Sequence, residues 1–390
     1  MTRLAVILGI GLIGVILIDA FETMILPRRV TRRFRLTRLI VLNGWRIWAR
    51  AARLLPSSGN REGGGLREGF LGGFGPLALL LLLGTWAAGL VTGFGLLIWG
   101  TGTPLGGPDP HPGLDAVLYL SGETFFTIGY GDLAPKAGLG RFLAVTEGAT
   151  GFSFLAVVIA YLPVIFTAYS QRETRITLLD ARAGSPPTAA AFLARQASGS
   201  QPFDLDEYFR EWELWSAELL EIQLSFPILV SFRSQHDRQS WLGALTVILD
   251  TTALVIAGLE TSEGPVPGRQ ARLTFAVARH AVGDFCQILV APPSPPASDR
   301  LPAADLGRLR EQLAASGLVL RLDADRLTAL RQLYEPYVAA LAARIQVAVP
   351  PWLPAADAQD DWETTAWQWD PEVARTAIRE PRDTGTVAGH

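Results

Sequence analysis

The longest stretch of this sequence without a charged residue runs from residue 69 to residue 108. A stretch of this kind indicates that part of the chain folds within a lipid bilayer. Its central part, residues 73 to 100, is apolar and exceeds the roughly 20 residues that a helix needs to cross a bilayer. Composition agrees, because 49% of all residues are hydrophobic, which is high for one soluble domain. We therefore predict an all-α membrane protein.

Two further stretches have the character of membrane spans. Residues 4 to 26 are apolar except for Asp19 and Glu22 near their end, which predicts an N-terminal transmembrane helix over residues 1–26. Residues 142 to 171 carry a single charged side chain, Glu147, and are longer than a span requires. Because a carboxylate facing lipid is costly, we expect Glu147 to form a hydrogen bond to the short helix that precedes this span or to a neighbouring subunit.

The segment over residues 27–70 is basic at its start: residues 27 to 55 hold nine arginines and no acid. Positive residues next to a span mark the cytoplasmic side, so we place this segment in the cytoplasm. The second span then crosses to the outside, the third span returns, and all residues after 170 are cytoplasmic. This predicts a multi-pass protein of the cell membrane. Apolar residues alternate with these arginines over residues 31 to 55, which fits either a helix on anionic membrane lipids or a solvated segment that only sets orientation.

The connection between the second and third spans contains a helix that is too short to cross a membrane. Residues 114–126 read as a helix of about three turns, so the chain must dip in and return. Non-helical backbone at membrane depth is tolerated only where it is buried in protein or lines a water-filled path. The turn over residues 127–132 is therefore either a pore lining or a buried structural turn.

The residues of this turn favour a pore lining. A dehydrated cation needs a stack of oxygen atoms, and backbone carbonyls provide one only when successive residues turn the same edge inward. Gly129 and Gly131 adopt positive φ at little cost, which would let Thr127, Ile128, Gly129 and Tyr130 direct their carbonyls to a common axis.

The stretch "SGETFFTIGYGDLAP" resembles the potassium channel pore family, whose filter reads T-V/I-G-Y-G. The matching residues are Thr127, Ile128, Gly129, Tyr130 and Gly131, followed by Asp132. The resemblance covers about residues 71–172 and implies an outer helix over 71–100, a pore helix over 114–126, a filter over 127–132 and an inner helix over 140–170.

This resemblance implies passive potassium conduction with K⁺ bound at Thr127, Ile128, Gly129 and Tyr130. One chain supplies one filter strand, so a ring of four implies a homotetramer. Nonselective relatives tend to lose the tyrosine, and its presence here favours potassium over sodium. K⁺ is then the permeant ion, and no other cofactor is implied.

Other residues are assigned to filter support and gating by the same resemblance. Glu123 and Asp132 would meet behind the filter and share a proton, or form a protonated clamp, and Tyr119 could hydrogen-bond to the pair. Gly151 falls where the family often has a gating hinge, and Gly148 competes for this role. Both glycines can instead serve close helix packing, which is favoured for Gly148. Pro163 can kink the inner helix. Phe126 departs from the family, which often has a hydroxyl residue there.

The part of the chain from residue 171 to 390 is acidic, with 28 acidic and 20 basic residues. We predict a linker over 173–200, an all-α cytosolic regulatory domain over 201–350, and an acidic tail with several tryptophans over 351–390. The apolar stretch 241–259 is either a fourth span or a buried core helix, and Asp250 within it favours the core helix.

The sequence also argues against several functional classes. Cys286 is the single cysteine, so no disulfide can form within the chain, and the four histidines lack the spacing of a zinc site. No cluster of catalytic residues and no phosphate-binding loop indicate an enzyme, and nothing indicates a nucleic-acid partner. A nonselective cation channel and a membrane sensor or scaffold with a structural pore-like loop stay open as alternatives, and the ligand of the cytosolic domain is unknown.

Overall fold

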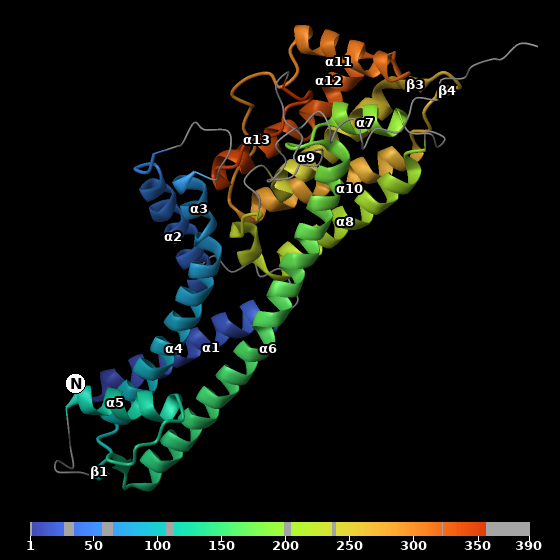
Figure 1. Cartoon of the computed structure of the whole chain (residues 1–390). Helices are drawn as coiled ribbons and strands as arrows, with labels where there is room; N and C mark the ends of the chain where they lie inside the picture. The colour runs from blue at the N-terminus through green and yellow to red at the C-terminus, as the bar shows by residue number, and fades with distance from the viewer. Residues whose placement is uncertain are drawn as a thin grey trace, which may run out of the picture. The chain divides into compact units, whose positions relative to one another are not determined.

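The structure is a computed structural model that describes residues 2–26, 35–56, 65–106, 113–198, 204–235, 239–321 and 323–355. It is mostly helical (Figure 1). The chain divides into two compact units. We call residues 1–171 with 221–233 the membrane unit, and residues 172–220 with 234–390 the C-terminal unit.

The described residues of the membrane unit form the three predicted spans, three shorter α-helices, a 3₁₀ helix, the end of a further helix and one antiparallel pair of short strands. The elements in chain order are α1 (Thr2–Met24), α2 (Leu36–Ala52), α3 (Leu66–Gly72), α4 (Phe74–Gly100), β1 (Leu105–Gly106), α5 (Leu114–Phe125), β2 (Ala134–Pro135), the first part of α6 (Gly138–Ala183), the end of α8 (Asp206–Ser225) and the 3₁₀ helix η1 (Pro227–Ser231). The strands β1 and β2 pair antiparallel, with Leu105 opposite Pro135.

Helices α1 and α4 pack closely along each other. A Cβ atom on Gly9 would lie only 2.7 Å from the carbonyl oxygen of Gly93, so this approach requires a glycine. Near the end of α1, the buried carboxylate of Asp19 accepts hydrogen bonds from the Leu36 and Thr37 amides, the Thr37 hydroxyl and the Trp86 indole. Asp19 therefore satisfies free amides at the start of α2 and joins α1, α2 and α4.

Helix α2 presents different chemistry on its two faces. Trp45, Ala49 and Ala52 are buried, and the Trp45 ring meets the Phe74 ring edge-on with 5.1 Å between centroids. The opposite face is exposed and holds basic and apolar side chains, namely Arg38, Leu39, Arg46, Ile47 and Arg50. The helix is thus attached to α4 by one face and leaves its arginines free of the core.

The C-terminal unit consists of helices with one small antiparallel sheet of strand order β4-β3-β5. Its elements, besides the ends of α6 and the start of α8, are α7 (Ala189–Ala197), α9 (Trp241–Gly258), β3 (Leu259–Thr261), β4 (Gly264–Pro265), α10 (Arg269–Ile288), α11 (Ala303–Ala315), β5 (Val319–Leu320), α12 (Ala324–Gln332) and α13 (Glu335–Ile345).

Helix α9 forms the centre of the C-terminal unit. Among the described residues, four helices are long and apolar enough to cross a membrane, and α9 is one of them. It differs from the others because 94% of its most apolar window is buried by the rest of the protein. Asp250 on this helix receives two hydrogen bonds from Arg300, of 2.7 and 3.2 Å, and one from Tyr334, of 2.5 Å. A buried charge with such partners suits a protein core, as the sequence favoured.

The structure differs from the sequence predictions in three places. The described residues include five short strands, so the fold is mostly helical and not all-α. The predicted linker over 173–200 is largely helical, because α6 continues to Ala183 and α7 begins at Ala189. Only the bend between them is non-helical, where Gly184 has a φ of +89° and the Thr188 hydroxyl accepts a bond from the Ala191 amide.

The third difference concerns the predicted regulatory domain over 201–350. Residues 221–233 belong to the membrane unit, so the boundary between the two units cuts through α8. Most of the predicted tail over 351–390 lies outside the described residues, as do parts of the basic segment over 27–70. Of the tail, residues 351–355 are described, and Trp352 is buried.

Candidate functional site

The short helix α5 is the platform of the predicted filter. Gly113 precedes it, and the negative charge of Asp115 in its first turn interacts favourably with the positive end of the helix dipole. One face, which includes Val117 and Leu120, is buried. The Ser121 hydroxyl lies 2.7 Å from the Val91 carbonyl oxygen of α4, which fixes α5 against the second span.

The third span, α6, contacts the same helix at two successive turns. Ser121 and Glu147 form a hydrogen bond, so the single acid of this span is bonded to the predicted pore helix, as we expected. One turn further along both helices, a Cβ atom on Gly151 would lie 1.9 Å from the Phe125 carbonyl oxygen. Glycine at position 151 therefore allows α6 to touch the end of α5.

The backbone of the loop after α5 alternates in handedness. The Thr127 and Ile128 amides bond back to the Thr124 and Glu123 carbonyl oxygens, at 3.1 and 2.8 Å. Positive φ then occurs at every second residue, with 58° at Thr127, 62° at Gly129 and 81° at Gly131. Alternation of this kind turns successive peptide groups so that their carbonyl oxygens can share one edge, which is the arrangement that coordinates a dehydrated cation.

Conformation, and not lack of space, explains the two glycines of this loop. A Cβ atom at Gly129 or Gly131 would meet nothing within 4 Å, but at positive φ any L side chain is strained. Thr127 adopts the same conformation without being glycine, which sequence reasoning did not anticipate. The loop lies open in the single chain, where Ile128 is 53% and Tyr130 is 72% exposed.

The predicted support residues lie beside this loop and make two hydrogen bonds there. Glu123 is 5% exposed, and its carboxylate accepts a hydrogen bond of 3.2 Å from the Tyr130 amide. The Tyr119 hydroxyl donates to the Asp132 carboxylate at 3.4 Å. The sharing of a proton between Glu123 and Asp132 stays a prediction.

A small clamp holds the exit of the loop, and sequence reasoning missed it. Strands β1 and β2 pair there, and the Lys136 amide donates to the Pro104 carbonyl oxygen at 2.9 Å. A Cβ atom on Gly140 would lie 2.1 Å from the Thr103 side chain, so the start of α6 also touches the segment that follows α4. The only sequence signal was the richness of residues 100 to 113 in glycine and proline, which indicates turns but no pairing partner.

The two predicted gating positions both lie inside one continuous helix. Helix α6 runs from Gly138 to Ala183 and contains Pro163 in its interior. Gly151 serves the close contact with Phe125, which fits the packing role that a glycine can have. By comparison, a Cβ atom on Gly148 would be 3.8 Å from its nearest neighbour, an ordinary contact distance.

Comparison with known proteins places a family on this part of the chain. Residues 113–168 match the model of the family described as Ion channel (Ion_trans_2). The matched range covers α5, the loop after it and α6 as far as residue 168. The chain therefore carries an ion-channel domain, and the matched family is one of channels and not of enzymes.

Two kinds of curated relatives are similar to this chain. The uncharacterized membrane protein YdjJ of Bacillus subtilis (strain 168) is 23% identical over 249 residues, which are 61% of this chain and 68% of the relative. Protein LctB of Geobacillus stearothermophilus is 44% identical over 46 residues, which are 12% of this chain and 34% of LctB. The match thus spans about a third of the length of LctB. No solved structure matches the chain.

Proposed function

We propose that this chain forms a homotetrameric, potassium-selective channel of the cell membrane that conducts K⁺ passively. The observation that carries the proposal is the alternating backbone of residues 127–131, held by α5 between two apolar helices. Four such strands around one axis supply the ring of carbonyl oxygens that replaces the hydration shell of the ion. Thr127, Ile128, Gly129 and Tyr130 are then the K⁺ ligands, and Gly131 ends the filter.

The exposure of the inner helix supports assembly from several copies. A single chain leaves many large apolar side chains of α6 uncovered, including Phe142, Val145, Phe152, Leu155 and Ile159. Lipid can cover only the part of this surface that faces outward, and the loop over residues 127–131 is open on the same chain. Packing of α6 and the loop against other copies covers both and closes the ion path.

Potassium flux into liposomes tests the proposal. Vesicles that contain the purified protein should take up K⁺ in preference to Na⁺, and barium should block this uptake. Gly129→Ala should reduce the flux to the level of empty vesicles while leaving assembly intact, because alanine at a φ of 62° is strained. Gly14→Ala is the matched control, since a Cβ atom at Gly14 meets nothing within 4 Å and its backbone is helical.

The same measurement separates the alternative functions. Equal K⁺ and Na⁺ uptake would identify a nonselective cation channel, and the absence of flux under every condition would favour a sensor or scaffold. Selective current in Gly129→Ala that equals that of the unchanged protein would refute the assignment of the filter.

Gating by the inner helix follows from the length of α6. At about 1.5 Å of rise per residue its 46 residues extend well beyond a hydrocarbon core of roughly 30 Å. Its residues up to 171 belong to the membrane unit and those from 172 to the C-terminal unit, so one helix belongs to both units. Movement near Pro163 can then change the cytoplasmic end of the pore.

Anionic lipid is the partner that the exposed face of α2 fits best. The helix joins two spans, and this face holds Arg38, Arg46 and Arg50 beside the 68% exposed Ile47, with no acidic residue on the helix. Such a face suits the boundary between headgroups and acyl chains. Substitution of these three arginines by glutamine should reduce the dependence of flux on anionic lipid, whereas Arg308→Gln in the C-terminal unit should not. An unchanged lipid dependence would leave α2 as a marker of orientation only.

A further inference from the structure

Residues 221–233 leave the C-terminal unit and return to it after packing within the membrane unit. They comprise the last turn of α8, the 3₁₀ helix η1 and the residues up to Arg233. We call them the coupling segment. Ile228, Leu229 and Phe232 of this segment are buried in one hydrophobic cluster with residues of α2, α4 and α6.

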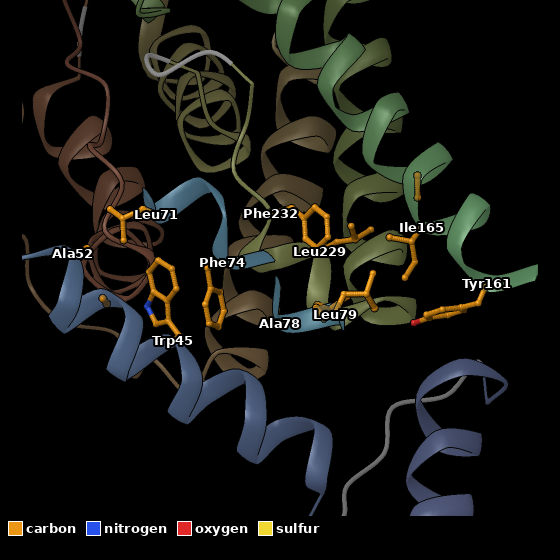
Figure 2. Close-up of a cluster of buried hydrophobic side chains, with 13 residues drawn as sticks. Trp45, Ala52, Leu71, Phe74, Ala78, Leu79, Tyr161, Ile165, Leu229 and Phe232 are labelled. Carbon is orange, nitrogen blue, oxygen red and sulfur yellow. The ribbon is translucent and has the colours of Figure 1, made fainter. Parts of the chain in front are cut away.

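The coupling segment is tightly fitted against the start of α4. The Phe232 side chain lies so close to Gly75 that a Cβ atom there would be 2.6 Å from the ring. Arg233 forms an ion pair with Glu68 on α3, the short helix that precedes α4. Figure 2 shows Phe232 and Leu229 between Phe74 of α4 and the inner helix.

The opposite side of the segment contacts the inner helix. The Tyr169 hydroxyl donates a hydrogen bond of 3.1 Å to the Arg233 carbonyl oxygen, and the rings of Tyr169 and Phe232 lie 5.8 Å apart. About two turns earlier on α6, the Tyr161 ring lies 5.6 Å from the Phe226 ring. The segment therefore bridges α4 and the stretch of α6 from 161 to 169.

One buried residue opposes this docked arrangement. Gln223 is fully buried, and neither its amide nitrogen nor its amide oxygen has a hydrogen-bond partner among the described residues. Burial of an unpaired amide is unfavourable, so Gln223 offsets part of the stabilisation from Phe232 and Arg233. A segment held by strong contacts and opposed by a buried polar group can exchange between a docked and a released state.

We propose that docking and release of the coupling segment set the position of the inner helix and thereby the open probability of the channel. This inference rests on the proposed function. Helix α4 is braced by α1 and by the Asp19 hydrogen bonds, so it is the fixed support of the bridge. The docked segment holds residues 161–169 of α6 to that support, and release lets them move. Any change of the C-terminal unit that pulls on residue 220 or 234 acts directly on this bridge.

Single-channel recording of two opposite variants tests the inference. Phe232→Ala removes the ring that fills the space against Gly75 and favours release, whereas Gln223→Leu removes the unpaired amide and favours docking. The two variants should shift the ratio of open to closed time in opposite directions, each by about 5- to 150-fold, with unitary conductance and K⁺/Na⁺ selectivity unchanged. Phe232→Leu, a milder change, should shift the ratio in the same direction as Phe232→Ala.

Leu214→Ala is the matched control, because Leu214 lies on the same helix α8 and is exposed. Leu214→Ala should have the same ratio of open to closed time as the unchanged protein. Shifts of Phe232→Leu and Gln223→Leu in the same direction, or no shift in either, overturn the inference.

Hydrogen exchange separates this inference from the proposed function. If the unchanged protein conducts no K⁺, the proposed function fails, and exchange then decides the coupling alone. Phe232→Leu should accelerate amide exchange in residues 226–233 and also in residues 161–169 of α6. Faster exchange in 226–233 without any change in 161–169 would show that the segment does not hold the inner helix.

Discussion

At the scale of single residues, the contact between α5 and α6 depends on a glycine and on a hydrogen-bonded acid, both in α6. Gly151 has no side chain where the Phe125 carbonyl oxygen approaches, and Glu147 bonds to Ser121 one turn away. Ser121 has one hydroxyl hydrogen, and its oxygen also lies 2.7 Å from the Val91 carbonyl oxygen, which can only accept. Ser121 therefore links Glu147 of α6 and the Val91 carbonyl oxygen of α4 to α5. The sequence located the acid, but only the structure supplied its partner.

Gly151→Ala tests whether this glycine serves contact with the pore helix. The added methyl group would overlap the Phe125 carbonyl oxygen at 1.9 Å, so α5 or α6 must shift. We expect a loss of about 1–3 kcal/mol in stability and disturbed potassium flux, because Phe125 lies two residues before the proposed filter. Thermal unfolding of the detergent-solubilised protein measures the first effect.

Gly148→Ala is the control for this substitution, since it lies on the same helix with an ordinary contact distance of 3.8 Å. It should keep both stability and flux. If Gly151→Ala were as stable and as conductive as Gly148→Ala, the close contact would have no importance for the pore.

At the scale of elements, the composition of α9 suits either a membrane span or a protein core. The residues packed around it place it in a protein core. Its apolar sequence would suit a membrane span, but the described helices around it supply Arg300 and Tyr334 to Asp250. Arg300 also bonds to Glu335 of α13 and to the Pro350 carbonyl oxygen. This buried network joins three separate parts of the C-terminal unit, at residues 300, 334–335 and 350, to its central helix.

Asp250→Ala should therefore destabilise the C-terminal unit strongly. Removal of one partner of a buried ion pair leaves the other charge uncompensated, which costs about 3–5 kcal/mol. The matched control is Glu260→Ala, because Glu260 pairs with Arg321, whose side chain is 75% exposed. Exposed pairs contribute about 0–1 kcal/mol. Denaturant unfolding followed by tryptophan fluorescence compares the two, and equal losses would contradict the role of the buried network.

At the scale of the whole molecule, the chain combines a pore-forming part and a helical C-terminal part that share two long helices. Helix α6 enters both units, and α8 ends in the membrane unit although it begins in the other. The described part of the predicted linker over 173–200 is therefore largely helical, with a bend between Ala183 and Ala189.

The assembled protein should contain four chains. Four copies are needed to surround an ion with carbonyl oxygens from the loop over residues 127–131, and they cover the apolar face of α6 at the same time. Native mass spectrometry in detergent should give the mass of four chains of 42.2 kDa each. A stable dimer or trimer would exclude a central filter of four strands and with it the proposed mechanism.

The sequence by itself determined the spans, the short helix and the chemistry of the loop. Long uncharged stretches leave the chain no option other than burial in lipid or protein, and glycines at alternate positions permit a backbone that few other residues adopt. The positive φ of Gly129 and Gly131 follows that expectation. These features are local, so they can be read from neighbouring residues without knowledge of the fold.

Only the tertiary structure decided which distant residues meet. The bonds of Asp19 to α2, the clamp of β1 and β2, and the fit of Phe232 against Gly75 join residues separated by up to 157 positions, as in the last of these contacts. The periodicity of the sequence does not predict such pairs, because the hydrophobic effect is non-directional and favours burial against any apolar partner. The burial of α9 was decided in the same way, by the packing of elements that lie far apart in the chain.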